Sequence, residues 1–188
     1  MDAYLDIETT FAHSISVIGI YRPDAGTIQL VGHGVTDVNL YAALDGVTAI
    51  YTFNGASFDL PIIRKRLFAD LKSEFVHHDL LRECRRQNLR GGLKLVEQKI
   101  GIARPTAGVN GSDALRLWHA YDTYGDEKAL DLLLRYNRDD IVNLPRLRCY
   151  LHKLREDEIH PAITIWNTAT EPVALPRDGQ RGATSRNE

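Results

Sequence analysis

Residues 3–9 read Ala3-Tyr4-Leu5-Asp6-Ile7-Glu8-Thr9, an apolar run interrupted by two acids. If this run is a strand, its side chains alternate between two faces, so Asp6 and Glu8 project together while Ile7 points the other way. Two neighbouring carboxylates repel each other unless a cation neutralises them, and such pairs often hold hard divalent metals. An edge strand with a solvated acidic face is the alternative. The apolar residues beside Asp6 are, however, those expected of an interior strand, where acids need a partner.

The rest of the chain combines strand and helix patterns, so the predicted fold class is mixed α/β. Apolar, β-branched runs predict further strands at residues 16–21, 27–31, 48–53 and 74–78. Residues 23–26, between the first two of these runs, have the composition of a turn, which favours antiparallel pairing. Helical periodicity predicts helices at residues 37–44, 57–71, 80–88, 92–100, 112–121 and 126–155, with Ser112 as an N-cap.

A further acid, Asp59, ends the sequence Asn54-Gly55-Ala56-Ser57-Phe58-Asp59, which leads from a predicted strand into a predicted helix. The helix dipole favours a carboxylate in the first turn, so Asp59 has an ordinary structural explanation. The loop between a strand end and a helix start is also where α/β folds place ligand-contacting groups. Both interpretations of Asp59 stay open at this point.

The longest predicted helix carries two adjacent acids, Asp139 and Asp140. At about 100° per residue, the leucines and the isoleucine of residues 130–151 gather on one broad face, and Asp140 falls inside that face. A carboxylate within an apolar stripe must be paired or metal-bound, because an isolated buried charge is costly. Tyr136 lies one turn earlier, close enough to share the site. Asp139 and its neighbour Arg138 are predicted to lie at the surface.

The composition is that of an ordinary globular chain, with 23 Lys and Arg, 25 Asp and Glu, and a formal net charge of −2. This balance argues against a molecule that is basic over its whole surface, as many nucleic-acid-binding proteins are. The charge is uneven, because residues 82–104, here called the basic segment, carry a net charge of +5. This segment is either a solvated helix face or a surface that follows phosphates; its cations are Arg82, Arg85, Arg86, Arg90, Lys94, Lys99 and Arg104.

The length of 188 residues predicts one folded domain, residues 1–160, and a flexible tail, residues 161–188, which has little to bury. Cys84 and Cys149 lie far apart and outside any metal-ligand spacing, so we interpret them as buried apolar residues in a reducing compartment. No stretch is apolar enough to cross a membrane, and the first ten residues lack the pattern of a secretory signal. The predicted location is cytoplasmic.

Several histidines and aromatic residues have structural explanations that we prefer. His77 and His78 lie at a predicted strand end beside an acid, where histidines are more often structural than metal ligands. Trp118, Tyr121 and Tyr124 have a spacing that would suit base stacking, but it is equally the spacing of a helix that packs on the core.

Three motifs in this order resemble a known family. Asp6-x-Glu8, then Asp59, then Tyr136-x-x-x-Asp140 are similar in order and spacing to the DEDD-type 3′–5′ exonucleases of the ribonuclease H-like superfamily, and the tyrosine indicates the DEDDy branch. Residues 5–10, 53–59 and 91–97 look most like the YprB-like group, which is related to the proofreading domain of family B polymerases. The resemblance covers about residues 4–151.

The resemblance implies a ribonuclease H-like α/β fold, with three antiparallel strands followed by two parallel ones and helices on both faces. It implies a metal-dependent 3′–5′ exonuclease that acts on single-stranded nucleic-acid ends through two divalent cations, Mg²⁺ or Mn²⁺. By the same resemblance Tyr136 orients the attacking water, and Thr9, Asn54 and Phe58 contact the terminal nucleotide. The implied metal ligands are Asp6, Glu8, Asp59 and Asp140.

Two other functions stay open. A catalytically inert nucleic-acid-binding module could have this fold, although the intact set of acids speaks against it. A ribonuclease H-like endonuclease has a similar acidic cluster but does not need Tyr136. The sequence does not choose between DNA and RNA, because recognition of a 2′-hydroxyl depends on pocket geometry. A polymerase, a helicase or another protein is a conceivable partner for so small a domain.

Overall fold

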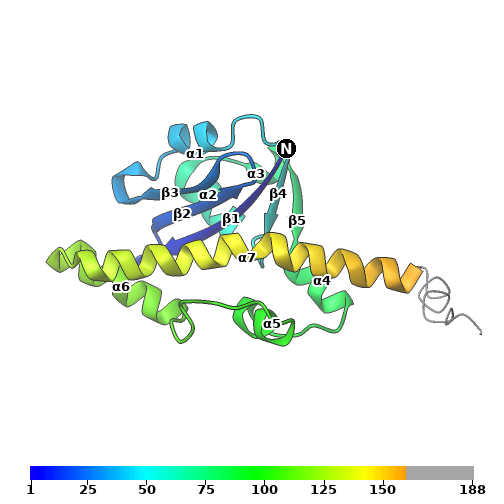
Figure 1. Cartoon of the computed structure of the whole chain (residues 1–188). Helices are drawn as coiled ribbons and strands as arrows, with labels where there is room; N and C mark the ends of the chain where they lie inside the picture. The colour runs from blue at the N-terminus through cyan, green and yellow to red at the C-terminus, as the bar shows by residue number, and fades with distance from the viewer. Residues whose placement is uncertain (160–188) are drawn as a thin grey trace, which may run out of the picture. The chain divides into compact units, whose positions relative to one another are not determined.

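The computed structural model describes residues 1–159, with side chains described through Arg155, and residues Met1–Leu154 form one compact unit. The predicted tail, residues 161–188, lies outside the described residues. Five strands form a single mixed sheet in the order β3-β2-β1-β4-β5 (Figure 1). They are β1 (Asp2–Thr9), β2 (Ile15–Arg22), β3 (Gly26–Val31), β4 (Ala49–Thr52) and β5 (Val76–Asp79). The pairs β1–β2 and β2–β3 are antiparallel, and the pairs β1–β4 and β4–β5 are parallel, which confirms the predicted α/β sheet.

Strand β1 is the middle strand, so the prediction of an interior strand is confirmed. Leu5 and Ile7 are buried in the apolar core on one face of the sheet. Tyr4 belongs to the core of the opposite face, and Asp6 and Glu8 follow it at alternate positions. One strand therefore supplies an apolar core on one face and two carboxylates on the other.

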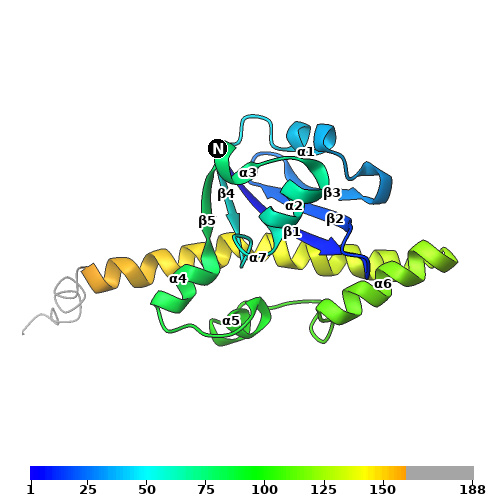
Figure 2. The same ribbon diagram turned by 180° about the vertical axis from the view of Figure 1, so that it is seen from behind.

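Helices cover both faces of the sheet. They are α1 (Asp37–Ala43), α2 (Asp59–Leu67), α3 (Leu71–Glu74), α4 (Leu80–Arg86), α5 (Leu93–Lys99), α6 (Gly111–Tyr124) and α7 (Glu127–Ile159), with a 3-10 turn at Gly32–Gly34. Helix α2 lies against one face and α7 runs along the other, as the two opposite views show (Figures 1 and 2). Within residues 1–159, no helix is both long and apolar enough to span a membrane.

Several helix boundaries differ from the predictions by a few residues, and two of the differences have a clear local cause. The helix predicted at residues 57–71 is divided into α2 and α3, because Phe68 adopts a left-handed conformation, with φ of 57°, that ends α2. The N-cap of α6 is Asn110 rather than Ser112. The Asn110 side chain accepts hydrogen bonds from the backbone N–H groups of Ser112 and Asp113, and the Asp113 carboxylate accepts one from the Asn110 N–H in return.

Most of the aromatic and cysteine residues that were predicted to be buried are buried or partly buried, but two are exposed. Trp118 is buried and Tyr121 packs partly buried against the same cluster, as expected, but Tyr124 is 78% exposed, so the prediction of core packing is wrong for that residue. It lies at the end of α6, where the helix has passed the edge of the core. Cys84 is buried as predicted, whereas Cys149 is exposed on α7. The prediction of burial is therefore wrong for Cys149, because its position on α7 is open to solvent.

The histidines take structural positions in β5, in line with the preferred interpretation. His77 forms a hydrogen bond of 2.9 Å with Thr52 of β4 through its Nε2. The ring of His78 stacks on that of Tyr51, with centroids 4.7 Å apart. Asp79 caps α4 by accepting from the Leu81 N–H. These contacts hold β5 and α4 to the sheet.

Candidate metal centre

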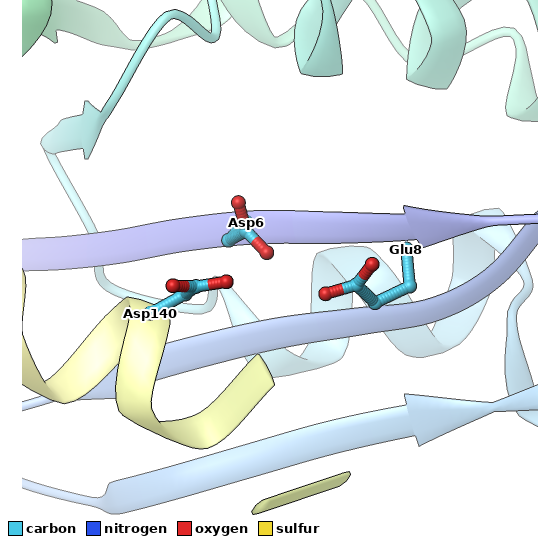
Figure 3. A group of neighbouring side chains, drawn as sticks. All are labelled: Asp6, Glu8 and Asp140. Carbon is cyan, nitrogen blue, oxygen red and sulfur yellow. The ribbon is translucent and has the colours of Figure 1, made fainter. Parts of the chain in front are cut away.

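Acids from two distant parts of the sequence converge on one face of the sheet. Asp6 and Glu8 of β1 point toward Asp140 of α7 (Figure 3). One carboxylate oxygen from each of the three lies within 4.8 Å of the other two. Glu8 and Asp140 are buried, which confirms the predicted burial of Asp140, and Asp6 is half-buried. Three carboxylates at this separation form a ligand set of the kind that hard divalent cations prefer.

The electrostatics of the three acids favour a bound cation. Burial raises the pKa of Asp6 and of Glu8 well above the ordinary values, and the charges of Asp140 and Asp59 raise both further. Burial also raises the pKa of Asp140, to about 6, against the opposing effect of Arg104. Without a cation the cluster therefore tends to retain protons near neutral pH. A divalent cation would displace these protons and relieve the repulsion.

Asp59, the fourth predicted acid, lies beside this group rather than within it. It is the first residue of α2, as its position in the sequence suggested, and it is buried. Its Oδ1 accepts a hydrogen bond of 3.0 Å from the Ile7 N–H, which ties α2 to β1. Burial raises the pKa of Asp59 to about 7. Its charge is close enough to raise the pKa of Asp6 and Glu8.

Asn137 orients Asp6, a role that the sequence analysis missed. Asn137 Nδ2 donates to Asp6 Oδ2 at 3.0 Å, and Asn137 Oδ1 accepts from Gln29 Nε2 at 3.0 Å. The neighbouring strand makes room for this amide at Gly19, the residue paired with Asp6, because a Cβ there would lie 2.2 Å from Asn137 Oδ1. The signal in the sequence was the spacing, since Asn137 lies three residues before Asp140 and so shares its face of the helix.

Asp140 forms an ion pair with Arg104. Arg104 was counted among the cations of the basic segment, which was predicted to lie at the surface, and for this residue the prediction is wrong. Arg104 Nη2 donates to Asp140 Oδ1, and Arg104 Nη1 donates to Glu97 Oε2 at 2.8 Å. The Arg104 side chain is 6% exposed. Asn143 Nδ2 donates to the other oxygen of Glu97 at 3.0 Å. Arg104 therefore neutralises two buried acids instead of presenting its charge at the surface.

The prediction that Asp139 lies at the surface is wrong. Asp139 is 8% exposed, and its Oδ2 accepts hydrogen bonds from the Thr106 N–H at 3.0 Å and the Thr106 Oγ1 at 2.6 Å. Thr106 belongs to the loop between α5 and α6, which covers this part of α7. The helical periodicity predicted that Asp139 points away from the apolar face of α7. It could not show that the loop between α5 and α6 would cover this side chain. Arg138 is exposed, as predicted.

Tyr136 and Lys94 complete the surroundings of the acids. Tyr136 is buried, and Lys94 Nζ lies 4.4 Å from the centroid of its ring. Lys94 Nζ is itself buried and makes no hydrogen bond to any residue that the structure describes. Burial lowers the pKa of Lys94 and raises that of Tyr136. A buried ammonium and a protonated phenol thus lie next to the three carboxylates.

Two cavities adjoin at the acids, and a third adjoins the second of them. The first, of about 480 Å³, contains the acids and two of the predicted substrate contacts; its lining includes Asp6, Glu8, Asp140, Tyr136, Thr9 and Phe58. The second, of about 410 Å³, is also lined by Asp6, Tyr136 and Asp140, together with Lys94. Asn54, the remaining predicted contact, lines neither of these but a third cavity of about 620 Å³. Its backbone N–H donates to Asp79 Oδ1 at 2.8 Å.

Comparison with known proteins identifies a family for this arrangement. The family model RNase_H_2, described as RNase_H superfamily, matches residues 3–152 of the chain. This range includes nearly all of β1, the whole of α2 and the part of α7 that carries Asp140, and so it contains every acid described above. No curated protein matches the chain.

Proposed function

Because the chain belongs to the RNase H superfamily, whose fold implies nuclease chemistry and a nucleic-acid substrate, we propose that it is a 3′–5′ exonuclease of the DEDDy type. One observation carries the proposal: the three clustered carboxylates and the phenol of Tyr136 line the same cavity. A ribonuclease H-like endonuclease would have no need of a tyrosine at that place. An inert binding module would have no reason to keep three repelling acids clustered, two of them buried.

The proposed metal ligands are Asp6, Glu8, Asp59 and Asp140, which would hold two divalent cations, Mg²⁺ or Mn²⁺. RNase H-like nucleases generally use divalent metal ions, and carboxylate oxygens are suited to them. Asp59 would contribute the oxygen that is not bonded to the Ile7 N–H. When bound, such ions stabilise the charge that develops on the phosphate and on the attacking and leaving oxygens.

Two residues of the chain are proposed to act on the reacting groups directly. Tyr136 stays protonated at neutral pH, because burial raises a pKa that is already near 10, so its hydroxyl orients the attacking water rather than accepting its proton. Lys94 is proposed to donate to a non-bridging oxygen of the phosphate. A phosphate oxygen would supply the hydrogen-bond acceptor that the buried ammonium lacks among the described residues.

The proposed reaction is the hydrolysis of the last phosphodiester bond. The oxygen of water bonds to phosphorus, the bond from phosphorus to the 3′ oxygen breaks, and the departing oxygen takes up a proton. The products are a nucleoside 5′-monophosphate and a strand shortened by one residue. The released nucleotide would lie in the cavity lined by Thr9 and Phe58, where Phe58, which is 43% exposed, offers its ring as a surface for base stacking. Asn54 stays a predicted substrate contact; it lines the cavity of about 620 Å³, which shares Phe53 and Gly92 with the one that contains Lys94.

The test is cleavage of a 5′-labelled single-stranded 20-mer, as DNA and as RNA, with Mg²⁺ or Mn²⁺ and with EDTA. A ladder shortened from the 3′ end supports the proposal, internal cuts support the endonuclease, and binding without products supports the inert module. Asp140→Asn is expected to abolish cleavage, because it removes a ligand from the metal site. Asp131→Asn, an exposed acid of the same helix, is the matched control. Cleavage by Asp140→Asn at the control rate would contradict the proposal.

A further inference from the structure

The cavity of about 620 Å³ beside the acidic site has the opposite electrostatic character. Its lining is Phe53, Asn54, Leu81, Arg85, Arg90, Gly91 and Gly92. Two of these residues, Phe53 and Gly92, also line the cavity that contains Lys94 and the acids. The two cavities therefore adjoin, and a ligand that extends past the acids would reach Arg85 and Arg90.

Both arginines are available for a ligand. Arg85 near the end of α4 and Arg90 in the following loop are exposed, and neither forms an ion pair within residues 1–155. Lys99 Nζ donates to the backbone oxygen of Arg90 at 2.7 Å, which holds the loop in place without using the guanidinium. Arg82 and Arg86 on α4 are exposed as well. These four arginines and Lys99 are the exposed cations of the basic segment, whereas Arg104 and the Lys94 ammonium are buried.

Charge complementarity identifies the occupant. An exonuclease places one nucleotide beyond the bond it cuts and the whole remaining strand on the other side, so nearly all substrate phosphates lie on that side. The cavity with Thr9 and Phe58 has neither lysine nor arginine in its lining. The cavity on the other side of the acids has two arginines that are exposed. Phosphates bind to such cations irrespective of base sequence.

We propose that Arg85 and Arg90 bind the backbone phosphates of the single strand on the 5′ side of the bond that is cut. This inference rests on the proposed exonuclease function and adds the path of the substrate to it. Phe53, which both cavities share, lies at the junction, where its ring is placed to contact the base next to the cut. The consequence is that these arginines matter for a long strand and contribute little to a substrate with a single phosphate.

The test compares two substrates: a single-stranded 15-mer and the p-nitrophenyl ester of thymidine 5′-monophosphate. The ratio of kcat/KM for the 15-mer to that for the ester should fall at least tenfold in Arg85→Ala/Arg90→Ala, through a higher KM for the 15-mer. The slope of log KM against log salt should also become shallower, by about 0.7 for each phosphate that the variant no longer neutralises. The matched control is Arg138→Ala/Arg146→Ala, two exposed arginines that line a cavity of about 630 Å³ on α7. It should keep the wild-type ratio and slope.

Two results would overturn the inference. One is the same ratio in both double variants, and the other is an equal loss on the 15-mer and the ester, which would place the arginines at the reacting bond. Failure of the proposed function is seen separately, because the wild type would then cleave neither substrate. In that case fluorescence anisotropy with the labelled 15-mer in EDTA still decides: Arg85→Ala/Arg90→Ala should weaken binding at least tenfold relative to the control variant, and equal Kd values would refute the arginine site.

Discussion

Replacing Gly19 by alanine should disturb the acidic cluster, although Gly19 carries no ligand. Gly19 lies opposite Asp6 on β2, and a Cβ added there would lie 2.2 Å from Asn137 Oδ1 and 2.8 Å from its Cγ. Asn137 is fully buried, with Gln29 bonded to its oxygen and Asp6 to its nitrogen. The amide therefore cannot move aside without breaking hydrogen bonds at both ends.

The size of the effect follows from two contributions. Overpacking a well-packed core by one methyl group costs about 1–3 kcal/mol. A hydrogen bond between neutral groups contributes about 0.5–1.5 kcal/mol, and Asp6, whose raised pKa favours its protonated form without a cation, would lose the one from Asn137. Because the side chains relax in part, we expect Gly19→Ala to lower the free energy of unfolding by about 2–4 kcal/mol. The affinity for Mn²⁺ should fall roughly 10- to 100-fold, as it does when a partner that orients a metal ligand is removed.

Urea unfolding of four proteins in EDTA measures this effect: the wild type, Gly19→Ala, Asn137→Ala and the double variant. With Asn137 truncated, the new methyl group has space, so Gly19→Ala should then cost less than about 1 kcal/mol. Isothermal titration with Mn²⁺ gives the metal affinity of the same proteins. If Gly19→Ala costs the same with and without the Asn137 side chain, the reasoning from this close approach is refuted.

Three further predictions concern the same site. Arg104→Met should lower the free energy of unfolding by about 3–5 kcal/mol at pH 7.5, measured by urea unfolding, because it leaves buried acids unpaired; a loss below about 1 kcal/mol would contradict this. Burial raises the pKa of Asp59 to about 7, so in EDTA its contribution to stability is present below about pH 4 and lost as the pH rises through 7. Unfolding at pH 4–8 should show that fall relative to Asp59→Asn, and identical profiles would count against it. Tyr136→Phe should reduce kcat roughly 100-fold with unchanged Mn²⁺ affinity by titration, and wild-type turnover would remove Tyr136 from the mechanism.

The net charge of −2 conceals two regions of opposite sign. The acids gather at the centre of one sheet face, where a cation would neutralise them, while Arg85 and Arg90 lie exposed in the adjoining cavity. A nuclease needs both, since its metals require carboxylates and its substrate requires cations. Overall composition is therefore a poor guide to the partner of such a protein.

The sequence by itself determined the parts of the fold and site that depend on local periodicity. The alternation of residues 3–9 was sufficient to place Asp6 and Glu8 on one face of a strand, and the apolar residues beside Asp6 indicated that this strand is interior. The helical period was sufficient to bury Asp140 in the apolar face of α7. The strand pattern repeats every two residues and the helix pattern about every 3.6 residues. Both can therefore be recognised in the sequence without knowing which segment packs against them.

Only the tertiary structure decided the contacts made between segments far apart in the chain. Arg104 looked like a surface cation and Asp139 like a surface acid, yet one pairs with Asp140 and the other is covered by Thr106. The bond from Asn137 to Asp6 joins residues 131 positions apart. The periodicity of a helix or strand predicts the direction in which each side chain points. Whether that side chain is buried, and which charge it pairs with, depends on the distant segments that pack against it. In this protein the sequence was therefore sufficient to locate the acids, whereas the side chains that hold the acids in place could be identified only from the tertiary structure.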